Sequence, residues 1–227
     1  MANSSAALLP RNTLWQPAST LHLVREEPAF LPLLVPALNS LLINGLQRGA
    51  IAEIYGPKSS GRTSTSMHVL AQATAAGEIC AFIDTNDTFH PDSAARAGIC
   101  LNRLIWVRSH GNAEHALRAA DLLLHAGGFG VVLLDLCDTT PRVLNRIPLS
   151  YWYRFRRALE NTPSILLICA ANPQANSCSL IKLALTSKAV LWSGRRPFSL
   201  LRGVESKASF RHTSLLRTAS LAIHSSV

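Results

Sequence analysis

The sequence lacks any CxxC pair of cysteines. Its five cysteines stand far apart, and most lie inside or beside apolar runs: Cys80, Cys100, Cys137, Cys169 and Cys178. This usage is typical of reduced core thiols in a cytoplasmic protein, so a disulfide framework is not predicted. The spacing between these cysteines and the eight histidines matches no zinc motif, and a zinc site is therefore not expected either.

Long uninterrupted apolar runs are also missing. The segment 30–46 is the most apolar stretch near the N-terminus, but Pro32, Pro36 and Asn39 interrupt it. A membrane-spanning helix is therefore not predicted there. The first ten residues have no basic start, and the short apolar run at 6–9 does not suit a secretory signal. Apolar residues still make up 48% of the 227 residues, which favours an α/β domain with a substantial core.

Acidic residues are scarce in the last third of the chain. Residues 141–227 contain 13 lysines and arginines but only two acidic residues, whereas residues 1–140 contain nine basic and eleven acidic ones. A basic segment of this kind indicates a polyanion or an acidic protein surface as partner. The alternative is that the charge serves solubility and has no specific target.

Short apolar runs alternate with amphipathic segments along the chain. Strands are predicted at 50–55, 80–84, 104–107, 131–135, 165–169 and 189–192. Helices are predicted at 62–76, 91–97, 113–124, 151–161 and 180–185. Continuous apolar strands separated by helices indicate the α/β class, with a mainly parallel twisted sheet flanked by helices on both faces.

Composition divides the chain into three parts. Residues 1–44 form an N-terminal extension rich in leucine and proline, and residues 45–194 form the predicted core. Residues 195–227 form a basic, serine-rich C-terminal region that is expected to be partly disordered. A chain truncated after Gly194 is accordingly expected to keep a folded core.

The most specific motif spans residues 56–63, Gly-Pro-Lys-Ser-Ser-Gly-Arg-Thr, between a predicted strand and a predicted helix. It follows the phosphate-binding pattern GxxxxGK[ST], with Arg62 at the lysine position. In such a loop, backbone N–H groups surround phosphate oxygens and the helix adds its positive end. The predicted nucleotide-binding residues are Gly56, Lys58, Ser59, Ser60, Gly61, Arg62, Thr63 and Ser64.

Two further residues complete a predicted site for ATP and Mg²⁺. Thr63 is placed to bind the metal, and Asp135 supplies a carboxylate at the end of the strand 131–135. Arg62 changes the chemistry, because a planar guanidinium does not replace a compact ammonium at a tight phosphate site. The alternative is a loop of this ancestry that no longer binds nucleotide.

Residues 37–192 resemble the core of the bacterial RecA recombinases, densely over 45–84 and beyond that only in the order of elements. The resemblance rests on Gly45-Leu46-Gln47-Arg48-Gly49, on the segment 52–57, on Ser59-Ser60-Gly61 and on the strand 80–84. RecA-type enzymes are DNA-dependent ATPases that polymerise on single strands. In them a glutamate two residues after the aspartate of this strand activates the attacking water. Asn86 occupies that place here, and Asp87 is one residue out of register, so no catalytic residue is assigned.

The two loops that contact DNA in RecA recombinases look short in this chain. Between Asp135 and the strand 165–169 there is room for a short loop and one helix, and only residues 173–178 precede the next element. A shortened core with a changed nucleotide site is similar to the ImuA proteins. These accompany an inactive polymerase homologue and an error-prone polymerase in damage-induced bacterial mutagenesis, and the division inhibitor SulA shares their fold.

The resemblance implies an adaptor in the bacterial DNA-damage (SOS) response that supports translesion synthesis. Its implied partners are a RecA-type recombinase and an ImuB-like polymerase subunit. An active DNA-dependent ATPase of recombination and repair, and a SulA-like inhibitor of cell division, are the alternatives.

Two basic clusters are candidates for contact with single-stranded DNA. In the segment 151–157, Tyr-Trp-Tyr-Arg-Phe-Arg-Arg, the aromatic rings either pack on the sheet or stack on bases. The second cluster either binds the DNA backbone or docks on an acidic groove of a polymerase partner. It consists of Arg195, Arg196, Arg202, Lys207, Arg211 and Arg217.

Overall fold

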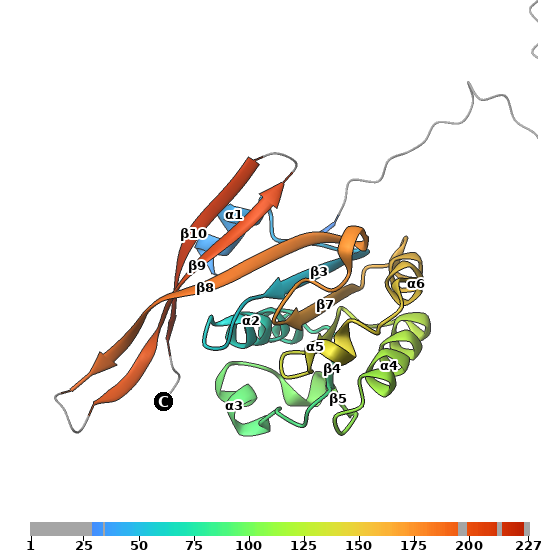
Figure 1. The fold of residues 1–227 in the computed structure, drawn as a ribbon, viewed down its shortest axis with the longest axis horizontal. Helices are drawn as coiled ribbons and strands as arrows, with labels where there is room; N and C mark the ends of the chain where they lie inside the picture. The colour runs from blue at the N-terminus through green and yellow to red at the C-terminus, as the bar shows by residue number, and fades with distance from the viewer. Residues whose placement is uncertain (1–28, 34, 195–198, 213–214, 225–227) are drawn as a thin grey trace, which may run out of the picture.

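The computed structural model describes residues 29–33, 35–194, 199–212 and 215–224. Within these residues the main sheet has eight strands in the order β10-β9-β8-β3-β7-β6-β4-β5. The strands from β8 to β5 run parallel to one another, and β9 and β10 are added antiparallel at one side. The fold is α/β, with a mainly parallel sheet like that of a RecA-like core, as predicted (Figure 1).

The parallel strands form the centre of the molecule. They are β3 (Ala50–Tyr55), β7 (Ile165–Ala170), β6 (Val131–Asp135), β4 (Cys80–Asp84) and β5 (Leu104–Arg108). In β4, β6 and β7 every residue is buried, which explains why these strands read as continuous apolar runs. The predicted positions of these strands are confirmed to within one residue at each end.

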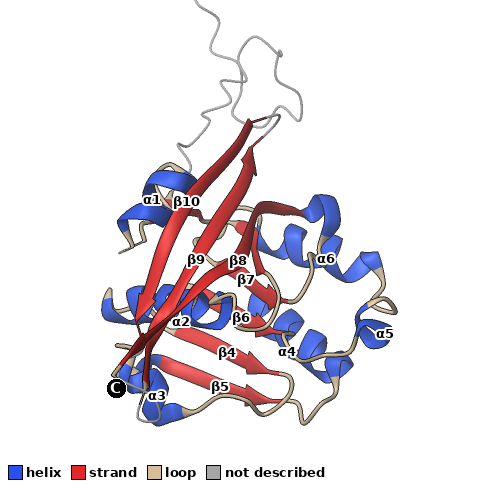
Figure 2. Ribbon diagram, turned by 60° about the vertical axis from the view of Figure 1, so that its left-hand side comes forward, coloured by secondary structure: helices blue, strands red, loops and turns tan. Residues whose placement is uncertain are grey.

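Helices cover both faces of this sheet. On one face α2 (Arg62–Ala75) packs on alternate residues of the central strands. On the opposite face α4 (Ala113–Ala126) and α6 (Leu149–Leu159) pack on the other set of alternate residues, as Figure 2 shows. The short helices α3 (Pro91–Arg96) and α5 (Pro141–Leu144) lie in connections between strands.

The C-terminal part of the sheet corrects two sequence predictions. The helix predicted at 180–185 is wrong, because these residues belong to the long strand β8 (Ser179–Ser193). Burial alternates there, with Ile181, Leu183 and Leu185 facing the core, which is the period of a strand. The disorder expected after residue 194 is wrong for β9 (Leu200–His212) and β10 (Leu215–His224).

The hydrophobic core crosses both predicted boundaries, at residues 44 and 194. The helix α1 (Pro36–Leu42) packs on β10 and β9, beside which it lies in Figures 1 and 2. The short strand β1 (Phe30–Leu31) pairs with β2 (Leu46–Gln47). Phe210 and Leu221 join the same cluster as Leu38. The described part of the extension and the C-terminal strands are therefore parts of one core.

None of the described helices has the length and apolar character that a membrane span requires.

Candidate nucleotide-binding site

The phosphate loop leaves the carboxyl end of β3 and enters α2. Gly56 follows β3 directly, and a Cβ atom added there would lie 2.2 Å from the carbonyl oxygen of Leu185 on β8. Only glycine permits this close approach of two backbones. Gly61 takes the left-handed conformation with φ of 85° and stands immediately before α2. The first-turn N–H groups of α2 have no acceptor inside the helix and provide an anion-binding end.

A cavity of about 380 Å³ opens over this loop. Six of the eight predicted nucleotide-binding residues line it, and so do both predicted magnesium ligands, Thr63 and Asp135. Gly56 and Ser60, the other two residues of this set, are buried and do not line the cavity. Its complete lining is Lys58, Ser59, Gly61, Arg62, Thr63, Ser64, Thr88, Asp135, Cys137, Asp138 and Val204. Val204 belongs to β9, so the C-terminal strands contribute one wall.

Arg62 is buried, and its guanidinium bridges two segments of backbone. One terminal nitrogen donates to the carbonyl oxygen of Gly56, at the start of the loop. The other donates to the carbonyl oxygen of Cys137, just beyond β6, over 3.2 Å. A lysine ammonium lacks this planar fork and cannot reproduce the same pair of bonds. The arginine at the diagnostic position therefore acts as a link inside the protein.

Lys58, the other cation of the loop, lies at the mouth of the cavity. Its side chain is 84% exposed, and its ammonium forms an ion pair of 3.2 Å with Asp138. Because the pair is exposed, its contribution to stability is small. A bound phosphate can therefore compete with Asp138 for Lys58 at little cost.

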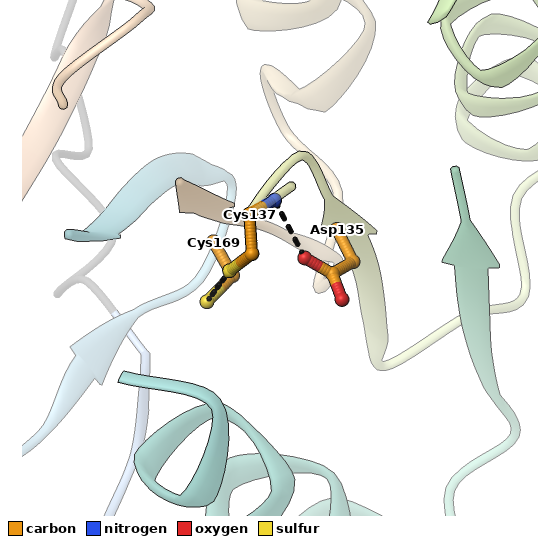
Figure 3. A group of neighbouring side chains, drawn as sticks. All are labelled: Asp135, Cys137 and Cys169. Atoms are coloured by element: carbon orange, nitrogen blue, oxygen red, sulfur yellow. Dashed lines mark hydrogen bonds between the residues drawn. The ribbon is translucent and has the colours of Figure 1, made fainter. Parts of the chain in front are cut away.

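Asp135 ends β6 and is buried beneath the cavity. One carboxylate oxygen accepts a 2.9 Å hydrogen bond from the backbone N–H of Cys137, and the other lies 3.5 Å from the hydroxyl of Thr88. Burial raises the pKa of Asp135, because desolvation disfavours its charged form. Figure 3 shows this carboxylate beside the thiols of Cys137 and Cys169. A cation at this position would stabilise the ionised carboxylate.

The segment after β4 contains no carboxylate that faces the cavity. The amide nitrogen of Asn86 donates to the hydroxyl of Thr139 over 3.3 Å. Asp87 accepts a 2.9 Å hydrogen bond from Arg108 and lies 2.8 Å from the ring nitrogen of His110. Asp87 does not line the cavity over the loop. The hydrogen bond from Arg108, followed by that of His110, lowers the pKa of Asp87, which makes it a weak base.

Sequence reasoning missed a second cavity that adjoins the first. It measures about 420 Å³ and shares Thr63, Ser64, Thr88 and Asp135 with the cavity over the loop. Its other lining residues are Met67, His68, Phe82, Phe89, His90, Ser93, Ala94, Arg96 and Ala97. The aromatic rings of Phe82 and Phe89 lie 4.6 Å apart, centre to centre, and give it an apolar wall. The residues come from separate elements, so no local motif marks them.

The aromatic cluster on α6 is mainly part of the core. Trp152 and Phe155 are buried, so they are not available to stack on bases. Arg154 pairs with Asp121 over 2.7 Å, and its guanidinium also lies over the ring of Tyr151. The packing alternative for residues 151–157 is therefore the one that the structure supports.

Four members of the second basic cluster belong to the C-terminal strands β9 and β10. Arg202 and Lys207 are exposed on β9, and Arg217 is partly exposed on β10. Arg195 and Arg196 lie outside the described residues, as does the side chain of Arg211.

Comparison with known proteins agrees with this geometry. A family model described as the RecA N-terminal domain matches residues 36–143. Over those residues the chain is RecA-like. Protein RecA of Mycolicibacterium vanbaalenii is 41% identical over 113 residues, which cover 49% of this chain and 32% of that protein. Protein RecA of Cutibacterium acnes is 42% identical over 104 residues, which cover 45% of this chain and 30% of that protein.

The RecA-like match includes the phosphate loop, Thr88 and the end of β6, which line most of the cavity. The match spans less than a third of the length of these relatives. Protein RecA of Kineococcus radiotolerans follows the same pattern, with 42% identity over 42% of this chain and 27% of that protein. The likeness thus lies in the part of the chain that contains the phosphate loop.

Proposed function

We propose that this chain is a RecA-like accessory protein of the bacterial DNA-damage response, with a nucleotide site that has lost efficient ATP hydrolysis. In this role it binds a RecA-type recombinase and an ImuB-like translesion polymerase subunit. ATP and Mg²⁺ are its proposed ligands, held by the phosphate loop, Thr63 and Asp135.

The observation that carries the proposal is the position of the Arg62 guanidinium. It is buried and bonded to the carbonyl oxygens of Gly56 and Cys137, so it serves the structure of the loop. The first turn of α2 still offers its N–H groups to a phosphate. The loop thus keeps N–H groups that can bind an anion, but at position 62 it has no lysine ammonium to reach a phosphate.

The surroundings of Asn86 support the loss of hydrolysis. An amide cannot accept a proton from water as a carboxylate can, and a missing general base typically lowers the rate by about 10²–10⁴-fold. The nearby carboxylate of Asp87 is paired with Arg108 and His110. Neither residue therefore supplies the base that a RecA-type ATPase needs.

The connections that follow β6 and β7 support a role other than strand exchange. Residues 136–164 connect β6 to β7 and contain the helices α5 and α6. The sequence predicted one helix in this connection. Only residues 171–178 connect β7 to β8. Long loops for DNA are therefore absent from these two connections, both of which lie wholly within the described residues.

The C-terminal strands offer a surface for a protein partner. Val190, Trp192 and Leu200 are exposed near the β8–β9 end, where Trp192 is 61% exposed. The exposed cations Arg202 and Lys207 lie on the same pair of strands. Apolar side chains mixed with basic ones suit an acidic protein groove, and aromatic and arginine residues are typical of interface centres.

ATP turnover by the purified chain, measured with and without single-stranded DNA, tests the proposal. We expect turnover well below about 1 s⁻¹, the lower edge of ordinary enzymes, under both conditions. DNA-stimulated turnover at or above that rate would contradict it. Co-purification from DNA-damaged cells tests the partners separately, and a recombinase or polymerase subunit is expected to come with the chain.

An active RecA-type ATPase is the second candidate, because Thr63 and Asp135 line the same cavity as the loop. Under this alternative, Thr63→Ala and Asp135→Ala abolish DNA-stimulated hydrolysis, and Arg62→Lys preserves or raises it. Variants without any effect on hydrolysis would exclude this candidate.

A further inference from the structure

Two thiols and a carboxylate meet at the carboxyl ends of β6 and β7. The sulfur atoms of Cys137 and Cys169 lie 3.2 Å apart, and the ligand atoms of Asp135, Cys137 and Cys169 all lie within 4.8 Å of one another (Figure 3). Asp135 and Cys169 are register partners on adjacent parallel strands. Cys137 follows two residues after Asp135, and its N–H holds the carboxylate in place.

We propose that Asp135, Cys137 and Cys169 form a binding site for a thiophilic divalent cation, with Zn²⁺ as the ion. Two cysteine sulfurs and one carboxylate oxygen are ligands that Zn²⁺ accepts, with about 2.3 Å to sulfur and about 2.0–2.2 Å to oxygen. Sulfurs on a tetrahedral Zn²⁺ lie roughly 3.8 Å apart at those bond lengths. The two sulfurs therefore need to move apart by about half an ångström, and the carboxylate oxygen has to approach them.

The electrostatics of this cluster favour a cation. Asp135 is buried, and none of the ion pairs among the described residues involves it. A buried carboxylate without a charged partner is costly, and metal coordination is one of the ways in which proteins stabilise it. Each thiol releases its proton to solvent as its sulfur binds the metal.

The cation has a route to the site from solvent. Cys169 is buried, but Cys137 is partly exposed, and both Cys137 and Asp135 line the cavity over the phosphate loop. Three protein ligands leave a fourth tetrahedral position, which water or a ligand in that cavity can fill. The site shares Asp135 with the proposed magnesium site, so Zn²⁺ and Mg²⁺ use this carboxylate in alternative ways. The zinc site does not depend on nucleotide binding.

Cobalt binding tests this site directly, because Co²⁺ bound to thiolate develops a charge-transfer absorption band. The full chain is reduced, freed of metal and kept without oxygen, and its five cysteines are first counted with a thiol reagent in denaturant. We expect Co²⁺ to produce the band in the nucleotide-free protein at one ion per chain. Zn²⁺ is expected to displace the cobalt and abolish the band.

Variants separate these ligands from the other thiols. Cys137→Ser is expected to lose the band and to weaken Zn²⁺ binding by at least roughly tenfold. Cys100→Ser, at an exposed cysteine outside the cluster, is the matched control and is expected to keep both. Asp135→Asn keeps the thiols and tests the third ligand, and it is expected to weaken Zn²⁺ binding as well. Circular dichroism confirms that each variant is folded.

Two results would overturn the site. One is a fully reduced wild-type protein that develops no charge-transfer band with Co²⁺. The other is a band of equal strength in folded Cys137→Ser. Both measurements are independent of ATP turnover, so the site and the proposed function fail or succeed separately.

Discussion

The hydroxyl of Ser206 donates a 2.8 Å hydrogen bond to the carbonyl oxygen of Ser60 and so joins β9 to the phosphate loop. Both residues are fully buried. Close by, Gly56 lies against the carbonyl group of Leu185 on β8. The phosphate loop is thus supported by strands that lie more than a hundred residues later in the chain. Its geometry depends on the whole sheet as well as on its own motif.

The first prediction concerns this hydrogen bond. Ser206→Ala leaves the carbonyl oxygen of Ser60 buried without its donor, which typically costs about 1–3 kcal/mol. Urea unfolding followed by circular dichroism is expected to show a fall of that size in the free energy of unfolding. Ser220→Ala, at an exposed serine on the neighbouring strand β10, is the matched control and is expected to change stability by less than about 0.5 kcal/mol. Equal effects of the two substitutions would contradict a structural role for Ser206.

The second prediction reverses the expectation for a chain that ends at Gly194. Removal of β9 and β10 uncovers Leu183 and Leu185 on β8 and takes Phe210 and Leu221 from the core. It also leaves the long strand β8 as an unpaired edge, which promotes aggregation. We expect the truncated protein to be insoluble or to melt without a cooperative transition. A soluble fragment with the thermal midpoint of the full chain would show that the core is independent.

The sequence predicted correctly those elements whose residue pattern is set by their own local segment. The strands β4, β6 and β7 are buried on both faces, so their continuous apolar runs can be recognised from their own residues alone. β9 carries many polar residues, and its order comes from pairing with β8 and packing against α1. The contact with α1 joins residues that are distant in sequence, and part of the partner strand β8 was predicted to be a helix, so composition alone suggested disorder.

The same distinction applies to the site. The phosphate loop is a contiguous motif with a fixed spacing, and its position between β3 and α2 was predicted correctly. The contact of Arg62 with Cys137 and the proximity of Asp135 to Cys169 were not predictable. Both depend on β6 and β7 being neighbours in the sheet, which no spacing between cysteines reveals.

The third prediction concerns a double variant that restores two residues of the RecA pattern. We expect the double variant Arg62→Lys, Asn86→Glu to raise ATP turnover by about 10²–10⁴-fold, the usual effect of a positioned general base. Arg62→Lys alone loses the two-pronged contact with Gly56 and Cys137 and is expected to lower stability by about 1–3 kcal/mol. Arg118→Lys, on the exposed face of α4, is the matched control for replacing an arginine by a lysine. Unchanged turnover in the double variant would place the loss of hydrolysis elsewhere.

The fourth prediction concerns pH. Because Arg108 and then His110 lower the pKa of Asp87, its carboxylate stabilises the folded state above its ordinary pKa. This contribution is lost as the pH falls through the lowered folded-state pKa. Thermal unfolding is expected to show a lower midpoint for Asp87→Asn than for the wild type at pH 7, and the difference is expected to close below about pH 4. A difference that widens on acidification would contradict the assigned pairing.

The fifth prediction concerns direct contact between the C-terminal strands and single-stranded DNA. Lys188, Arg202 and Lys207 are exposed on β8 and β9. If all three contact phosphates, counterion release predicts that affinity for oligothymidylate falls by roughly 20-fold between 50 and 200 mM salt. Fluorescence anisotropy measures this, and Lys207→Ala is expected to lower the logarithmic salt slope by about 0.7. Arg118→Ala, on α4, is expected to leave the slope unchanged. A flat response to salt would mean that these cations do not contact phosphates, which would favour a protein as the partner of this surface.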